Sequence, residues 1–175
     1  MKSTIIALLL LLSASSWSQE TEFKFSKDGL TDFVVGTFDT NTKNLYAWTL
    51  AWAKENKTNK IISQVENEKI TFQGTKDNFL CSKAGGTNIC NGTTYTIEIT
   101  IKEGKYKFDV TELVTYDKKQ TITKVDLNNF SQFYDKDGNL KKYSTEVPAA
   151  YEGLFNGLNK NLLTFLDKKK KAENW

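Results

Sequence analysis

The stretch "TTYTIEITIKEGKYKFDV", residues 93–110, alternates apolar and polar side chains on both sides of a Glu103-Gly104 turn. Alternate residues of a strand point to opposite sides of the sheet, so this pattern predicts an antiparallel hairpin with one apolar and one wetted face. The wetted face of this hairpin is a candidate interaction surface, and the alternative is that it is simply solvated, as is common for antiparallel sheets. Its residues are Thr96, Glu98, Thr100, Lys105, Lys107 and Asp109.

Other parts of the chain repeat this alternation. Residues 32–39 and 68–74 have a period of two, and residues 111–133 show it more weakly. The segment "YDKDGNLKKY", residues 134–143, is typical of a turn between short strands. We therefore expect several antiparallel strands in addition to the central hairpin.

Two segments have helical periodicity instead. In residues 42–57, Leu45, Trp48 and Trp52 recur at helical spacing, and Thr42 or Asn41 can cap the helix. A second helix is predicted from residue 147 to residue 171. Its apolar stripe consists of Val147, Tyr151, Leu154, Phe155, Leu158, Leu162 and Phe165. The order strand, helix, several strands, helix predicts an α+β domain with both helices packed on one face of the sheet.

Several of these segments also resemble a known family. They are "KDGLTDFVV", "LYAWTLAW", "ENEKITFQG", "NFLCSK", "YTIEITIKEGKYKF" and "LFNGLNKNL". As a set, they are similar to a family of exported Gram-negative bacterial proteins, a domain of unknown function with a TBP-like fold, named after the TATA-binding protein. The resemblance covers about residues 26–166. It implies a curved antiparallel sheet backed by two helices, and it carries no activity or site residues.

The beginning of the chain has the three parts of a secretory signal peptide. Lys2 supplies the positive charge, residues 5–12 form an apolar run, and small residues precede a cleavage site between Ser18 and Gln19. The apolar run is much shorter than the roughly 20 residues that span a bilayer, so we expect no transmembrane segment after cleavage. Residues 19–175 then form a single domain, either periplasmic or secreted.

The chain has two cysteines, Cys81 and Cys90. A metal site is poorly supported, because the chain has no histidine and two thiolates fill only half of a tetrahedral site. A redox pair usually has the spacing C-x-x-C, which this pair lacks. In an exported protein we predict a disulfide around Gly85-Gly86, worth about 2.7 kcal/mol in the chain-entropy model. The alternative is a pair of free structural thiols.

Composition argues against several other classes of function. The net charge is +3, the 24 basic residues are all lysine, and acidic and basic residues are interspersed along the chain, so no nucleic-acid partner is expected. Without histidine or a paired-carboxylate motif, we expect no catalytic residues and no cofactor. The "DKDGN" segment, residues 135–139, has its glycine in the fourth place rather than the sixth, which favours a turn over a calcium loop.

The aromatic residues leave two functions open. Trp48, Trp52, Phe155 and Phe165 have the spacing of core residues, but they could also line a cavity between helices and sheet. We predict an exported, non-catalytic binding or interaction domain with an unknown protein or glycan partner. The alternative is a carrier of a small apolar ligand held between the helices and the sheet.

Overall fold

The computed structural model describes residues 22–84 and 87–173, so the predicted signal peptide, Gly85 and Gly86 lie outside the described residues. The strands are β1 (Phe25–Ser26), β2 (Gly29–Leu30), β3 (Phe33–Thr37), β4 (Lys60–Val65), β5 (Lys69–Ala84), β6 (Thr87–Lys102), β7 (Lys105–Tyr116) and β8 (Ile122–Lys124). The helices are α1 (Thr42–Glu55) and α2 (Val147–Glu173), with short 3-10 turns at Ser131–Phe133 and Lys142–Ser144. None of the helices within these ranges is long and apolar enough to cross a bilayer.

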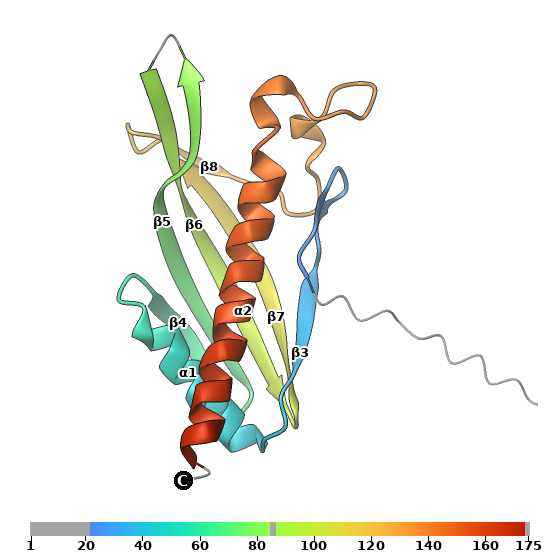
Figure 1. Ribbon diagram of the computed structural model, residues 1–175. Coiled ribbons are helices and arrows are strands. Elements are labelled where there is room, and N and C mark those ends of the chain that lie inside the picture. Colours follow the sequence, from blue (N-terminus) through green and yellow to red (C-terminus); the bar gives the residue numbers. More distant parts are fainter. Residues whose placement is uncertain (1–21, 85–86, 174–175) are drawn as a thin grey trace, which may run out of the picture.

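The main sheet is antiparallel and has the strand order β3-β7-β6-β5-β4. In addition, β8 pairs with the last three residues of β7, Val114–Tyr116. The predicted hairpin forms β6 and β7 at the centre of this sheet. Its apolar residues are buried, with Ile97, Ile99 and Phe108 at 0% exposure. Figure 1 shows that the sheet twists and bends, and that α1 and α2 lie on the same face of it. The predicted α+β architecture is therefore confirmed.

Helix α1 begins where the sequence predicts. Asn41 caps it, because the Asn41 side-chain oxygen accepts a hydrogen bond from the backbone N–H of Asn44 at 2.8 Å. Leu45 and Trp52 are buried against the sheet, while Trp48 is only partly buried. Of the two capping residues considered, the structure selects Asn41.

Helix α2 buries a slightly different stripe from the predicted one. Leu154, Leu158 and Phe165 are only partly buried, whereas Asn159 and Leu166 are buried. The buried residues of α2 include positions 151, 155, 159, 162 and 166. A search for apolar residues at helical spacing does not find position 159, because Asn159 is polar. Asn159 is buried because its side-chain oxygen accepts a 2.7 Å hydrogen bond from the Tyr106 hydroxyl.

The segment before β1 is fixed to α2. The Asn156 side chain accepts a hydrogen bond from the Phe23 N–H at 2.7 Å and donates one to the Phe23 carbonyl at 2.9 Å. The Phe23 ring is 1% exposed and contacts the rings of Phe108 and Phe155 at 5.8 and 5.7 Å between centroids. This segment therefore belongs to the core between α2 and the sheet.

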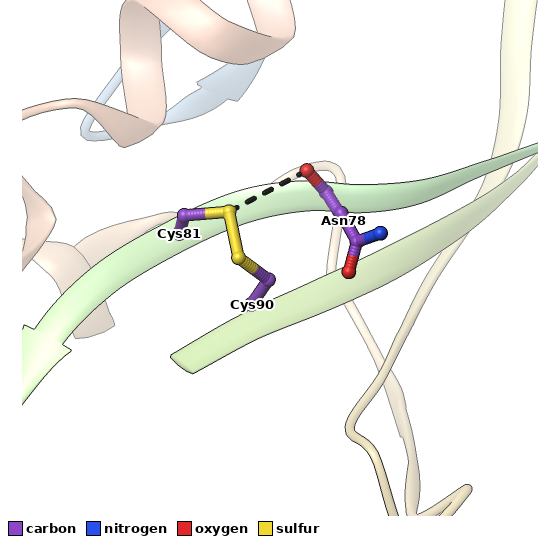
Figure 2. Close-up of a disulfide and its surroundings, with 3 residues drawn as sticks. All are labelled: Asn78, Cys81 and Cys90. Atoms are coloured by element: carbon purple, nitrogen blue, oxygen red, sulfur yellow. Dashed lines mark hydrogen bonds between the residues drawn. A yellow bond between two sulfur atoms is a disulfide. The ribbon is translucent and has the colours of Figure 1, made fainter. Parts of the chain in front are cut away.

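Strands β5 and β6 extend beyond the rest of the sheet as a two-stranded arm, which we define as residues 80–84 and 87–91. Residues of the arm pair only with each other, because β7 stops pairing with β6 at Gly92. The predicted disulfide joins Cys81 and Cys90, which face each other directly across the arm (Figure 2). The Asn78 carbonyl oxygen lies 3.6 Å from Cys81 Sγ, a contact only, since a disulfide sulfur carries no hydrogen.

Other parts of the chain were predicted less completely. The sequence did not predict β4, and the weak alternation in residues 111–133 contains only the end of β7, β8 and one 3-10 turn. The turn predicted at residues 134–143 is confirmed by a bridge between Tyr134 and Leu140, but the short strands expected beside it are replaced by the two 3-10 turns. Asp135 Oδ1 accepts hydrogen bonds from the N–H groups of Asp137 and Asn139, each at 2.9 Å, and Gly138 has a φ of 82°.

Candidate interaction surface

The six predicted surface residues lie on one face of the sheet. Glu98 is paired with Asp109 and Thr100 with Lys107 in the register of β6 and β7. These positions alternate with buried residues that face the helices, so their side chains point to the other side. We call Thr96, Glu98, Thr100, Lys105, Lys107 and Asp109 the outer face. Neither helix covers it in Figure 1.

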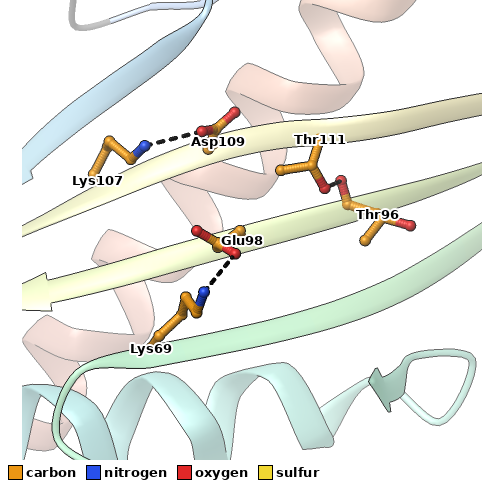
Figure 3. A network of polar contacts seen from close by, with 6 residues as sticks. All are labelled: Lys69, Thr96, Glu98, Lys107, Asp109 and Thr111. Atoms are coloured by element: carbon orange, nitrogen blue, oxygen red, sulfur yellow. Dashed lines mark hydrogen bonds and ion pairs between the residues drawn. The ribbon is translucent and has the colours of Figure 1, made fainter. Parts of the chain in front are cut away.

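Most charges on the outer face are neutralised locally. Glu98 Oε2 lies 3.2 Å from Lys69 Nζ, and Asp109 Oδ2 lies 3.0 Å from Lys107 Nζ (Figure 3). The Lys107 ammonium also lies 5.0 Å from the centre of the Phe33 ring, which is 43% exposed. Partly exposed ion pairs contribute at most about 1 kcal/mol each to stability. Their main effect is a surface that offers hydrogen bonds and has little net charge.

A β-bulge adds a residue to the outer face that the sequence analysis missed. Thr96 pairs with Glu112, but the next residue, Ile97, pairs with Val110, so Thr111 is the extra residue on β7. The Thr111 hydroxyl donates to the Thr96 carbonyl at 3.4 Å (Figure 3). The available signal was the loss of strict alternation after Val110. Such a break does not reveal which residue bulges.

An open groove of about 690 Å³ adjoins the outer face where β3 begins and β8 ends. Asp109 of the outer face lines this groove, and so does the bulged residue Thr111 beside it. The groove brings together segments about 90 residues apart in the chain, which no local pattern in the sequence could predict. The lining residues are Leu30, Thr31, Asp32, Asp109, Val110, Thr111, Lys124, Val125, Asp126, Leu127 and Asn128.

The aromatic residues between helices and sheet contact one another. The Trp52 ring lies 5.6 Å from that of Phe72, and Phe155 lies 5.9 Å from Tyr95, both edge to face. The Trp52 indole N–H donates to the Asn161 side-chain oxygen at 2.7 Å. These contacts are those of a packed core, as the helical spacing predicts.

Phe165 lies elsewhere. It lines a shallow surface hollow of about 340 Å³ between the end of α1 and the end of α2, together with Glu55 and Lys168. The four aromatic residues considered for a ligand cavity are therefore not brought together around one space.

Two buried tyrosines of the core, Tyr106 and Tyr151, have shifted pKa values. Burial raises the pKa of the Tyr106 and Tyr151 hydroxyls, which keeps both protonated at neutral pH. Tyr106 acts as a hydrogen-bond donor within the core. No group of three or more metal-ligating side chains occurs in residues 22–84 and 87–173.

Solved bacterial structures are similar to this chain. A DUF4468 family protein from Bacteroides ovatus ATCC 8483 is similar over 80% of this chain and 85% of its own, with a TM-score of 0.54 and 13% identity. A TBP-like protein from Parabacteroides distasonis ATCC 8503 covers 78% of this chain and 88% of its own, with a TM-score of 0.48 and 12% identity. No protein-family model and no curated protein matches the sequence. At these identities the first likeness shows a common fold.

Proposed function

We propose that this chain is an exported, non-catalytic domain that binds a protein or glycan partner through the outer face. The observation that carries the proposal is the asymmetry of the sheet: both helices cover one face, and the other face is open (Figure 1). An open face with paired charges and threonine hydroxyl groups can form hydrogen bonds with a partner at a small desolvation cost. The groove beside Asp109 and Thr111 gives this face a concave margin.

Export is part of the proposal. It is supported by the signal-like residues 1–18 and by the Cys81–Cys90 disulfide, since disulfides persist mainly in oxidising compartments. The fold shared with the DUF4468 protein and the sequence resemblance together support assignment to an exported domain family. The apolar carrier is the weaker alternative, because the rings between helices and sheet contact one another.

The proposal is tested with the double variant Thr100→Glu/Lys105→Glu. Position 100 lies between Lys69 and Lys107 in the register, so a new carboxylate there has two ammonium neighbours and folding should be preserved. The control is Lys57→Glu/Thr58→Glu, which makes the same changes in the exposed connection between α1 and β4. Neither pair of changes touches the core.

Tagged proteins are used to recover partners from the cell envelope of the host, and the partners are identified by mass spectrometry. We expect at least one partner to be lost by Thr100→Glu/Lys105→Glu and retained by Lys57→Glu/Thr58→Glu. Equal recovery of every partner by both folded variants would exclude the outer face as the binding surface.

A further inference from the structure

The groove beside the outer face exists because the sheet edge is interrupted. On the side of β7 away from β6, β3 pairs with Lys105–Asp109 and β8 pairs with Val114–Tyr116. Between these two strands no described strand pairs with residues 110–113, which at about 3.3 Å per residue leave a gap of about 13 Å. One hydrogen bond enters the gap, from the Val125 N–H to the Leu113 carbonyl at 2.9 Å.

The interruption has the size and direction of a short peptide. Both β3 and β8 run antiparallel to β7, so a segment of three or four residues in the gap would continue the line from β8 to β3. The hydrogen bond from the Leu30 N–H to the Leu127 carbonyl at 2.9 Å joins the segment before β3 to the segment after β8. Asp109 and Thr111 line the groove from the outer face, so we place the entry of a ligand on that side.

The charge of the groove identifies the kind of segment that fits. Of the charged groups that line it, Asp109 is paired with Lys107, and Lys124 is paired with Glu112 at 3.3 Å. Two carboxylates remain, Asp32 on the segment before β3 and Asp126 on the segment after β8. Both are exposed, and neither forms an ion pair with any residue of the described chain.

We propose that this groove binds a basic extended segment of a partner protein, with a lysine or arginine side chain between Asp32 and Asp126. The main chain of the segment pairs with the unpaired edge of β7 at residues 110–112, and its apolar atoms contact Val125 and Leu127. The inference rests on the proposed binding function and names the chemistry of the partner. Recognition by exposed carboxylates weakens as salt concentration rises, because the Debye length shortens.

The test is an NMR titration of the isotopically labelled, disulfide-bonded protein with the capped peptide acetyl-Lys-Lys-Lys-amide. We expect saturable chemical-shift changes at the backbone amides of Val110, Thr111 and Leu127. The affinity obtained from them should be at least about tenfold weaker in high salt. The double variant Asp32→Asn/Asp126→Asn should lose these shifts. Its asparagine at position 126 keeps the side-chain oxygen that accepts the Asn128 N–H at 3.0 Å, so the local turn is preserved.

Matched controls separate the parts of the proposal. Asp137→Asn/Asp167→Asn removes two exposed carboxylates elsewhere and should bind trilysine like the parent protein. Acetyl-Glu-Glu-Glu-amide should not shift the groove amides, and 1,5-diaminopentane, which has amines but no peptide groups, should bind at least about tenfold more weakly than trilysine.

Three results would overturn the proposal: no groove shifts with trilysine, shifts that survive Asp32→Asn/Asp126→Asn, or diaminopentane binding as tightly as the peptide. If the groove fails while Thr100→Glu/Lys105→Glu still loses a partner, the binding function stands and its ligand contacts another part of the outer face. If the groove binds trilysine while Thr100→Glu/Lys105→Glu and Lys57→Glu/Thr58→Glu both keep every envelope partner, the groove is a site independent of the outer face.

Discussion

At the residue scale, three glycines on the sheet each lie beneath a tyrosine ring of the neighbouring strand. Each pair is formed by directly opposite residues in the register, and a Cβ on any of the three glycines would overlap ring atoms of its tyrosine. The missing side chain lets the ring lie flat across the strand, as in sheets where an aromatic residue covers a glycine. The pairs are Gly36 with Tyr106, Gly74 with Tyr95, and Gly92 with Tyr116.

Gly36→Ala should therefore destabilise the protein by about 1–3 kcal/mol, the usual cost of overpacking a core. The Tyr106 ring cannot turn away easily, because it is 1% exposed and its hydroxyl is bonded to Asn159. As a control, Gly153→Ala on the exposed side of α2 meets no atom within 4 Å and should stabilise by about 0.5–1 kcal/mol through helix propensity. Urea denaturation measures both free energies of unfolding. A Gly36→Ala protein as stable as the parent would contradict this account of the pair.

Tyr116 gives a prediction about pH. Desolvation, followed by its 2.5 Å hydrogen bond to Asp77 and the charge of that carboxylate, raises the pKa of the Tyr116 hydroxyl to about 12. A raised pKa in the folded state means that folding favours the protonated phenol. The stability from this group is complete below the ordinary pKa of about 10 and is lost as the pH rises from 10 to 12.

Asp77→Asn keeps an oxygen acceptor but removes the negative charge, so the pKa of Tyr116 should fall towards 10 while desolvation keeps it above that value. NMR titration of the Tyr116 ring measures the change. Identical titration curves in the parent and Asp77→Asn proteins would show that the carboxylate has no influence on the phenol.

At the scale of elements, strict periodicity made some elements predictable. Both strands of the β6–β7 hairpin and the cap of α1 follow from local residue patterns. Strand β4 was missed because its residues are all exposed or half-buried and show no alternation. The arm of β5 and β6 was missed because register shifts between Lys76 and Leu80 interrupt the pattern. Asn159 was missed because its burial depends on a hydroxyl 53 positions away.

The disulfide acts on one element, the arm. Replacing both cysteines by alanine, Cys81→Ala/Cys90→Ala, should cost about 2–3 kcal/mol in the chain-entropy model for a sequence separation of 9. The arm pairs with no other described strand, so its amides at residues 80–84 and 87–91 should exchange with solvent much faster in the variant.

Amides of the buried stretch at residues 97–101 should keep most of their protection in the same hydrogen-exchange experiment, because this stretch is paired on both sides. Uniform loss of protection along β6 would show that the disulfide holds the whole sheet together. Unchanged exchange in the arm would show that the disulfide is not needed even there.

At the scale of the whole molecule, the sequence was sufficient to predict one layer of helices on one face of an antiparallel sheet. It also predicted which residues share the opposite face, because a period of two determines the side of a strand without knowledge of its neighbours. It could not predict the groove. Asp32 and Asp126 line the same groove only because β3 and β8 pair with the same edge of β7, and this long-range pairing cannot be predicted from a local pattern.

The central claim is that the partner binds on the face of the sheet that the helices leave uncovered. The most direct test is site-specific photocrosslinking in the host, with a photoreactive residue at Thr111 or Lys105 on the sheet side, or at Ala47 or Lys160 on the helices. All four positions are exposed. We predict that Thr111 and Lys105 both crosslink the same partner and that Ala47 and Lys160 do not. Crosslinks from the helix positions alone would contradict the account and place binding on the opposite side of the molecule.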